Sequence, residues 1–335
     1  PLVARPYGLG ALVAFGGRRY RGELRVHAAR EGLTVVNALP IEEYLRGVVP
    51  LELNAFAPAE AAALEAQAVA ARSYTYSRLA EYLPRAQAEA RAAQPFDLRD
   101  TVADQVYGGA DAERDASDRA VRATAGLVLR YGGAVVSAPY YSACGGSTAE
   151  PGEVWQTGGA GEPFLRCVSD RVPGTDRHWC EAAPRHHWTR TWDGDALRAV
   201  FERHLRRHAS GEGARVAGAP VGTVRALTLQ GRTTSGRVSA LAVAADGGRY
   251  LLRGNEIRFA LRSLGGEILP STYFSVDSLV ADDEGRIARL TLRGQGNGHG
   301  VGMCQWGAIG RSRAGHDVRA ILRTYYPGTT IEAAE

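Results

Sequence analysis

The sequence predicts an α+β protein, with a mixed β-rich fold around a buried, alanine-rich helix. Short β-type segments and amphipathic helical segments follow one another irregularly, without the strand–helix–strand repeat of a parallel α/β fold. The 335 residues are 45% hydrophobic and 23% charged. This length and balance suit a chain with one large core or two smaller ones, and they exclude a disordered chain.

The first 36 residues predict a β-rich segment packed on the core. Apolar runs at residues 11–15, 20–26 and 33–36 are separated by glycine or polar turns, as in small antiparallel sheets. Pro40, followed by Glu42 and Glu43, predicts the start of a short helix. That helix leads into residues 48–52.

The strongest helical pattern runs from Pro58 to about residue 83. Pro58 suits the first helical turn, Glu60 favours the positive end of the helix dipole, and small or apolar residues recur at helical spacing. The alanine-rich face allows close approach of another element, so we expect this helix to be buried centrally. Gln67 and Arg72 lie within it, and by pattern alone each is a solvated or core-bridging polar group.

Further elements follow without regular alternation. We expect strands at residues 102–107, 127–131, 274–280 and 287–292, hairpins over 221–250, and helices at 116–124, 193–207, 254–264 and 318–325. An aromatic strand that contains Tyr140 and Tyr141 ends in the turn Cys144-Gly145-Gly146. Residues 193–250 combine a helix with hairpins and could form an inserted second lobe.

The charge distribution argues against a nucleic-acid partner. Basic residues number 40 against 36 acidic ones, for a net charge of +4, and all the basic ones are arginines. They do not cluster as a nucleic-acid footprint requires. No stretch approaches the roughly 18 to 20 apolar residues that cross a bilayer. The chain opens at Pro1 without an initiator Met or a signal-peptide pattern, which we interpret as a trimmed or mature start.

Glycine occupies every second position over residues 294–302, the most unusual local sequence in the chain. Such density lets the backbone approach a ligand or another backbone closely. The spacing in twos, without an apolar helix opening after a strand, argues against a dinucleotide-binding loop. His299 within this run could be an acid–base group, a donor to substrate or a structural histidine, and the pattern alone favours the structural role.

The four cysteines allow several interpretations. A Cys–His nucleophile pair could use Cys144 or Cys304 with His299, and the spacing does not test it. A group of possible zinc ligands occurs in one region: Cys167, His178, Cys180, His186 and His187.

However, no Cys-x-x-Cys pair is present, and Cys167 and Cys180 bracket a Pro-Gly turn. We therefore favour a Cys167–Cys180 disulfide and expect no metal and no cofactor. Cys144 and Cys304 then pair with each other or remain buried thiols.

Glu52 carries an ambiguous local signal. Leu51 and Leu53 flank it, and Val48-Val49-Pro50 precede it. A carboxyl group in such apolar surroundings would have a raised pKa and could act as a general acid near neutral pH. A surface glutamate in a loop is the simpler interpretation, and the local residues alone favour it.

Four blocks of sequence, taken together, resemble the stage II sporulation protein D family, whose other branch is the LytB amidase-enhancer group. They are residues 39–52, 64–74, 140–148 with 154–155, and 298–308 with 325–328; residues 105–109 and 269–271 also fit. The blocks occur in the family's order. The resemblance assigns a catalytic domain to residues 37–331.

This resemblance implies a lytic transglycosylase that cuts peptidoglycan glycan strands outside the cytoplasmic membrane. Its catalytic acid would be Glu52, which reverses the interpretation from local residues. The implied substrate-binding residues are Gln67, Arg72, Tyr140, Tyr141, Ser142, His299, Gln305 and Trp306. An extracytoplasmic location makes the Cys167–Cys180 disulfide more plausible and implies membrane association only through a removed N-terminal anchor or signal.

Two other functions remain open from the sequence. The family's enhancer branch implies a non-catalytic peptidoglycan-binding protein that stimulates a cell-wall amidase. A Cys144-dependent peptidase is a third hypothesis, which predicts sensitivity to thiol alkylation.

Overall fold

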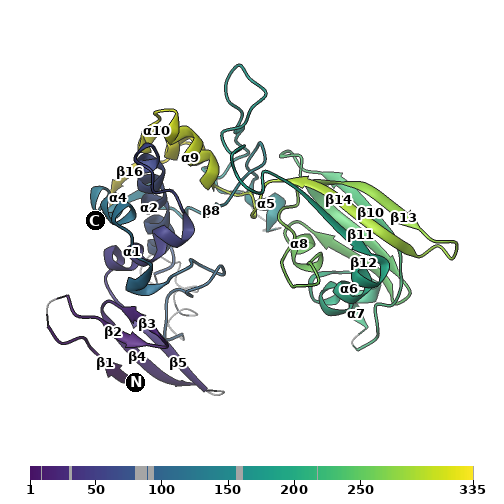
Figure 1. Cartoon of the computed structure of the whole chain (residues 1–335), viewed down its shortest axis with the longest axis horizontal. Helices are drawn as coiled ribbons and strands as arrows, with labels where there is room; N and C mark the ends of the chain where they lie inside the picture. Colours follow the sequence, from purple (N-terminus) through teal and green to yellow (C-terminus); the bar gives the residue numbers. More distant parts are fainter. Residues whose placement is uncertain are drawn as a thin grey trace. The chain divides into compact units, whose positions relative to one another are not determined.

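The computed structural model describes residues 1–8, 10–29, 32–79, 89, 94–155, 161–216 and 218–334. The chain divides into two compact units, Pro1–Pro139 with Arg311–Glu335, and Tyr140–Gly310. Each unit combines helices and strands, which confirms the predicted α+β class (Figure 1). Residues 193–250, the predicted inserted lobe, lie within the second unit. No helix among the described residues is both long and apolar enough to cross a bilayer.

The first unit begins with two small antiparallel sheets. One has the order β1-β4-β5 and the other pairs β2 with β3. The strands are β1 (Leu2–Ala4), β2 (Val13–Phe15), β3 (Arg18–Tyr20), β4 (Glu23–Ala29) and β5 (Gly32–Ala38). The predicted β-rich N-terminal segment is therefore confirmed, with turns where glycine and polar residues interrupt the apolar runs.

A buried helix, α2 (Ala61–Tyr76), forms the centre of the first unit. Its residues from Leu64 to Thr75 are almost all buried, and most are alanines or other small residues. These short side chains let three helices pack around it, which are α1 (Ile41–Glu52), α4 (Asp115–Ala123) and α10 (Val318–Tyr325) (Figure 1). This confirms the predicted central helix over Ala61–Tyr76, preceded by the 3₁₀ turn η1 (Pro58–Glu60). The helix ends earlier than predicted, because residues 77–79 form turns, and residues 80–83 lie outside the described residues.

The predicted strand over residues 102–107 does not form. Its backbone donors are used elsewhere, because the Val106 N–H binds the Glu52 side chain and the Tyr107 N–H binds the Asp100 carbonyl. A strand would need those groups for a ladder. The unit is completed by η3 (Gly109–Ala112) and by a sheet of β16 (Thr330–Ala333), β6 (Leu127–Tyr131) and β7 (Ala134–Val135).

The second unit contains two three-stranded antiparallel sheets, β10-β11-β12 and β13-β14-β9, packed on the helix α6. The predicted helix over 193–207 and the predicted hairpins over 221–250 are confirmed. The strands are β9 (His187–Asp193), β10 (Val224–Arg232), β11 (Val238–Ala245), β12 (Gly248–Arg253), β13 (Phe274–Ala281) and β14 (Ile287–Gln295). The helices are α6 (Gly194–His208), α7 (Glu212–Arg215) and α8 (Glu256–Ala260).

A parallel pair of two-residue strands, β8 (Tyr140–Tyr141) and β15 (Met303–Cys304), lies in the same unit. The elements α5 (Pro151–Val154) and α9 (Gln305–Arg313) complete the description. The glycine run preceding β15 packs against the turn after β8. At Gly296, where φ is +77°, a Cβ atom would lie 2.8 Å from backbone atoms of Cys144. Close packing of two backbone segments therefore explains glycine here.

Candidate active site

Glu52 is the last residue of α1, at the point where the chain leaves the helix. Pro50, two residues before that end, cannot donate a backbone hydrogen bond, and Leu53 is already extended, with φ −129° and ψ 101°. The Glu52 side chain is partly buried, and its Oε1 accepts a 2.6 Å hydrogen bond from the backbone N–H of Val106. The structure therefore places Glu52 at a helix end with a fixed carboxyl group.

The surroundings of Glu52 favour its protonated form. Burial raises the pKa of Glu52, while the Val106 N–H opposes the shift by binding the charged form. In the described part of the chain, no arginine lies within ion-pair distance of this carboxyl group. A carboxyl group with a raised pKa can donate a proton at a pH where an ordinary glutamate cannot.

A network of polar groups fixes the segment that supplies the Val106 N–H. Gln105 is fully buried; its Nε2 donates to the Ala71 carbonyl at 3.1 Å, and its Oε1 accepts from Tyr44 at 3.1 Å and Thr75 at 3.0 Å. Burial raises the pKa of the Tyr44 phenol, and the nearby carboxylates of Asp104 and Glu52 act in the same direction. The network thus joins α1, α2 and the 104–107 segment around one carboxyl group.

The local sequence around Tyr44, Gln105 and Val106 predicts no functional role for them. The available signal was the Gln105-Val106-Tyr107-Gly108-Gly109 block, which was recognised as part of the family pattern. A contact made by a backbone N–H leaves no mark on residue identity, so Val106 itself could not be found this way.

Arg72 is a structural residue, which corrects its prediction as a substrate-binding group. Its side chain is 0% exposed and forms a two-pronged ion pair with Glu42, at 2.7 and 2.8 Å. It also donates to the carbonyls of Val121 and Leu127. Because these partners surround the guanidinium inside the unit, it cannot reach a ligand at the surface. Gln67 is likewise 0% exposed, so its predicted contact with substrate is also not available.

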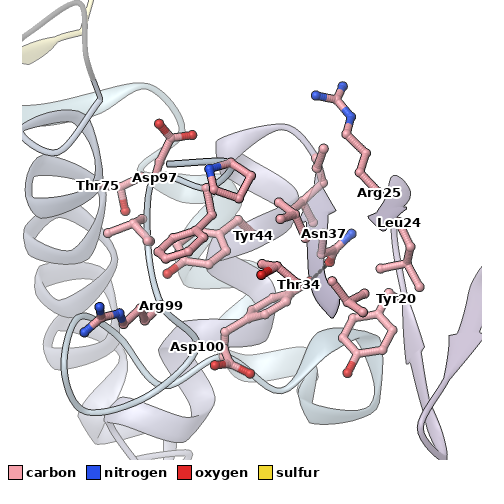
Figure 2. A pocket seen from close by; sticks show the side chains of 18 of the residues that line it. Tyr20, Leu24, Arg25, Thr34, Asn37, Tyr44, Thr75, Asp97, Arg99 and Asp100 are labelled. Atoms are coloured by element: carbon pink, nitrogen blue, oxygen red, sulfur yellow. Dashed lines mark hydrogen bonds between the residues drawn. The ribbon is translucent and has the colours of Figure 1, made fainter. Parts of the chain in front are cut away.

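A cavity of about 530 Å³ lies in the first unit (Figure 2). Tyr44 and Thr75, which both bind Gln105, are among its lining residues, whereas Glu52 is not. Its walls are mixed, with the aromatic rings of Tyr20 and Phe96 and several charged side chains: Arg25, Asp97, Arg99 and Asp100. Its volume is within the range of small-ligand sites.

The other predicted substrate-binding residues lie in the second unit, near β8 and β15. Tyr141 and Gln305 are buried, at 5% and 6% exposure. Tyr140, Ser142 and Trp306 are partly buried, and the Trp306 N–H donates to the Ser142 carbonyl at 3.0 Å. The structure brings these residues together within one unit, and their contact with a sugar stays a prediction.

His299 is held on both ring nitrogens by the backbone. Nε2 lies 3.0 Å from the Tyr140 carbonyl, to which it donates, and Nδ1 accepts from the Val301 N–H at 3.1 Å. Burial, aided by nearby Arg258 and Arg237, lowers the pKa of His299 to about 3. Because backbone groups bind both nitrogens of this neutral imidazole, neither nitrogen is available for acid–base catalysis. This arrangement suits a structural histidine, the role that the sequence pattern alone favoured.

The cysteines correct two predictions. All four, which lie in described residues, are free thiols, so the predicted Cys167–Cys180 disulfide is wrong. The sulfur of Cys180 lies 3.3 Å from that of Cys144, away from Cys167. Nor does a Cys–His299 pair form, because His299 is bound to the backbone. Burial raises the pKa of the Cys144 and Cys304 thiols, which argues against either as a nucleophile.

Comparisons with known proteins cover both units. The model of the stage II sporulation protein family matches residues 29–131, and that of a domain of unknown function, DUF8618, matches residues 154–302. The first match contains Glu52 and Val106. The second lies within Tyr140–Gly310.

Three relatives illustrate the similarity. An uncharacterized protein of Brachyspira hyodysenteriae is 28% identical over 94% of this chain and 73% of its own length. The amidase enhancer of Bacillus subtilis is 28% identical over 86% of this chain, which spans only 40% of the enhancer. Stage II sporulation protein D of Bacillus subtilis is 26% identical over 90% of this chain and 76% of its own.

Proposed function

Because the chain belongs to the stage II sporulation protein D and amidase-enhancer family, we propose that it is a lytic transglycosylase of peptidoglycan glycan strands. The substrate places its action outside the cytoplasmic membrane. The observation that supports an enzyme is Glu52, a partly buried carboxyl group with a raised pKa and one fixed oxygen.

One carboxyl group suffices for this reaction. Protonated Glu52 donates its proton to the glycosidic oxygen between muramic acid and glucosamine, and the bond from the anomeric carbon to that oxygen breaks. The Glu52 carboxylate then removes the proton of the muramic acid 6-hydroxyl, whose oxygen attacks the anomeric carbon. The product is a 1,6-anhydro end, no water is consumed, and Glu52 returns to its protonated form.

The geometry at Glu52 suits both steps. The Val106 N–H holds Oε1, and none of the described residues binds Oε2, so Oε2 is available for the migrating proton. Burial favours the acid before the first step, and the N–H stabilises the carboxylate formed by it. A hydrolase would need a second carboxyl group to activate water or form a covalent intermediate.

The experiment that tests this proposal follows the product. Purified glycan strands, with and without stem peptides, are incubated with the full chain, and 1,6-anhydro ends are measured by mass spectrometry. Wild type should release them and Glu52→Gln should not. Glu65→Gln is the matched control, because Glu65 lies in the same unit and burial also raises its pKa. Equal background release by wild type and Glu52→Gln contradicts the proposal.

A second candidate function rests on the amidase-enhancer relative. In it, the chain binds peptidoglycan and stimulates a cell-wall amidase without cutting glycan. Adding such an amidase to the same reactions separates the two functions. Stimulation that persists in Glu52→Gln, without anhydro products from wild type, supports the enhancer.

A further inference from the structure

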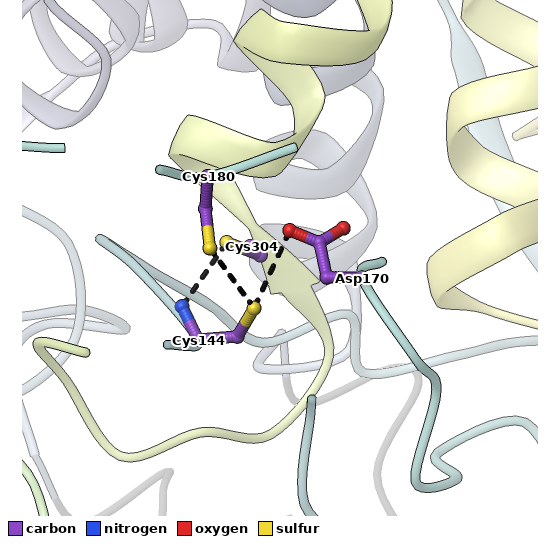
Figure 3. Close-up of side chains that lie close together, drawn as sticks. All are labelled: Cys144, Asp170, Cys180 and Cys304. Atoms are coloured by element: carbon purple, nitrogen blue, oxygen red, sulfur yellow. Dashed lines mark hydrogen bonds between the residues drawn. The ribbon is translucent and has the colours of Figure 1, made fainter. Parts of the chain in front are cut away.

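Four side chains from separate segments of the second unit converge on one buried point (Figure 3). They are Cys144 after β8, Asp170 and Cys180 in the segment before β9, and Cys304 at the end of β15. Their three sulfur atoms and one carboxylate oxygen all lie within 4.8 Å of one another. All four residues are 0% exposed.

Backbone groups are arranged around the sulfurs as they are around metal-bound thiolates. The Sγ of Cys304 accepts from the N–H groups of Cys144 at 3.2 Å and Gly307 at 3.3 Å. The Sγ of Cys144 accepts from the Gly146 N–H at 3.3 Å. Such N–H donors stabilise negative sulfur, and outer hydrogen bonds of this kind orient metal ligands.

We propose that Cys144, Cys180, Cys304 and Asp170 bind one zinc ion in a closed, structural site. Zinc prefers four ligands in a tetrahedron and takes cysteine sulfur at about 2.3 Å, which sets neighbouring sulfurs about 3.8 Å apart. The distances from the Cys144 sulfur to the Cys180 sulfur, 3.3 Å, and to the Asp170 oxygen, 3.4 Å, require only a small expansion. Full burial leaves no open position for substrate, so the ion would hold structure.

His186 fits this site as an outer partner. Its Nδ1 lies 3.5 Å from the Cys180 sulfur, and its ring is 6% exposed. A ring N–H directed at a zinc-bound thiolate would orient that ligand and partly neutralise it. The His186 carbonyl in turn accepts from the N–H of Gly296, which connects the site to the glycine run.

A disulfide is the competing interpretation, and it explains less of the arrangement. Three sulfurs can form only one disulfide among themselves, which would leave a third buried thiol beside a buried carboxyl group. A divalent cation uses all four groups as ligands and offsets two of their four negative charges. The ion would also join the Cys144-Gly145-Gly146 turn to the start of α9, two segments 160 residues apart.

The local sequence favoured a disulfide over a metal, because no Cys-x-x-Cys pair is present and Cys167 and Cys180 bracket a Pro-Gly turn. Cys180 and His186 were among the possible zinc ligands, but Cys144 and Cys304 were considered separately. Cys167 was grouped with them and in the structure lies outside the cluster.

The test measures bound metal on the full chain. The protein is purified under reducing conditions, dialysed against metal-free buffer, and its zinc counted per chain before and after incubation with zinc sulfate. We expect one zinc per chain in wild type. Cys304→Ser should lose it, and Cys167→Ser, which changes the cysteine outside the cluster, should keep it.

Substitution of His186, the outer partner, should weaken zinc binding less than substitution of Asp170, a direct ligand. His186→Gln should weaken zinc binding by about 10–100-fold, as measured by competition with a chelator. Asp170→Asn should weaken it further, because a charged ligand is lost. Equal zinc content in wild type and Cys304→Ser overturns the proposal.

A measurement on wild type alone guards against variants that do not fold. Cobalt(II) in a tetrahedral thiolate site gives strong visible and sulfur-to-metal charge-transfer absorption. We expect this spectrum with one equivalent of Co²⁺ and its loss on adding zinc sulfate. Absence of the spectrum in folded protein that takes up no zinc, or a Cys144–Cys180 disulfide in a peptide map, overturns the proposal.

Discussion

The substitution Glu52→Gln removes the proton donor while it keeps the local geometry. Glutamine has nearly the same shape, and its Oε1 can still accept the 2.6 Å hydrogen bond from Val106. Burial raises the pKa of Glu52, so at neutral pH the charged carboxylate is less stable in the folded protein than in water. A neutral amide removes that cost. We therefore expect the variant to be at least as stable as wild type.

The expected loss of activity follows from the role of the proton. General acid catalysis typically contributes about 10²–10⁴-fold. At about 1.4 kcal/mol for each factor of ten, this is about 3–5 kcal/mol of transition-state stabilisation. Because the Val106 contact is preserved, little of the loss should come from misplacement, and kcat should fall with little change in KM.

The pH profile supplies an independent readout. The first step needs protonated Glu52, so activity should decline as the pH rises through its pKa, which burial raises above that of an ordinary glutamate. The contribution of Glu52 to folding stability should also decrease as the pH rises. The contribution of a group with a raised pKa is present below its unfolded pKa and is lost as the pH rises through the folded one. The stability difference between wild type and Glu52→Gln should therefore grow from pH 4 to neutral.

The assay combines release of 1,6-anhydro ends with urea unfolding of both proteins at several pH values. Glu65→Gln serves as control in each. Loss of activity with a matching loss of stability would refute the reasoning, because Glu52 would then be a structural residue. An alkaline limb of the activity profile that lies at or below the pKa of an ordinary glutamate would also contradict it.

Three further predictions concern stability, measured by urea unfolding. Gly296→Ala should cost about 1–3 kcal/mol more than Gly285→Ala, because both have positive φ, +77° and +71°, but only at Gly296 would the new Cβ meet backbone atoms. His299→Gln should lose most stability at neutral pH and less as the pH falls from 6.5 toward about 3, since the lowered pKa favours the neutral ring in the folded state. Glu42→Gln should cost about 1.5–3 kcal/mol, because it leaves the buried Arg72 without its anionic partner.

Only some features of the candidate site could be predicted from the local sequence. The flanking leucines allowed a raised pKa at Glu52, although the local residues alone favoured a surface glutamate, and burial in the structure raises that pKa. The hydrogen bond from the Val106 N–H to Glu52 could not be predicted from the sequence. The two residues are 54 positions apart, so their contact depends on the tertiary fold. The prediction that Arg72 binds substrate came from the family resemblance and is wrong. Its ion pair with Glu42, 30 residues away, is a tertiary contact that the local pattern does not show.

Secondary structure could be predicted from the sequence wherever the periodicity of apolar residues is strong. The alanine-rich helix, α6, α10 and the hairpins over 221–250 follow from apolar spacing, caps and turns, which act over a few residues. The contacts between the cysteine sulfurs, in contrast, could be seen only in the tertiary structure. The residues around Cys144, Cys180 and Cys304 have no sequence pattern in common. Their sulfurs are in contact because three segments pack together: the turn after β8, the segment before β9, and β15. Local propensity acts over one or two turns, whereas such meetings depend on packing of the whole unit.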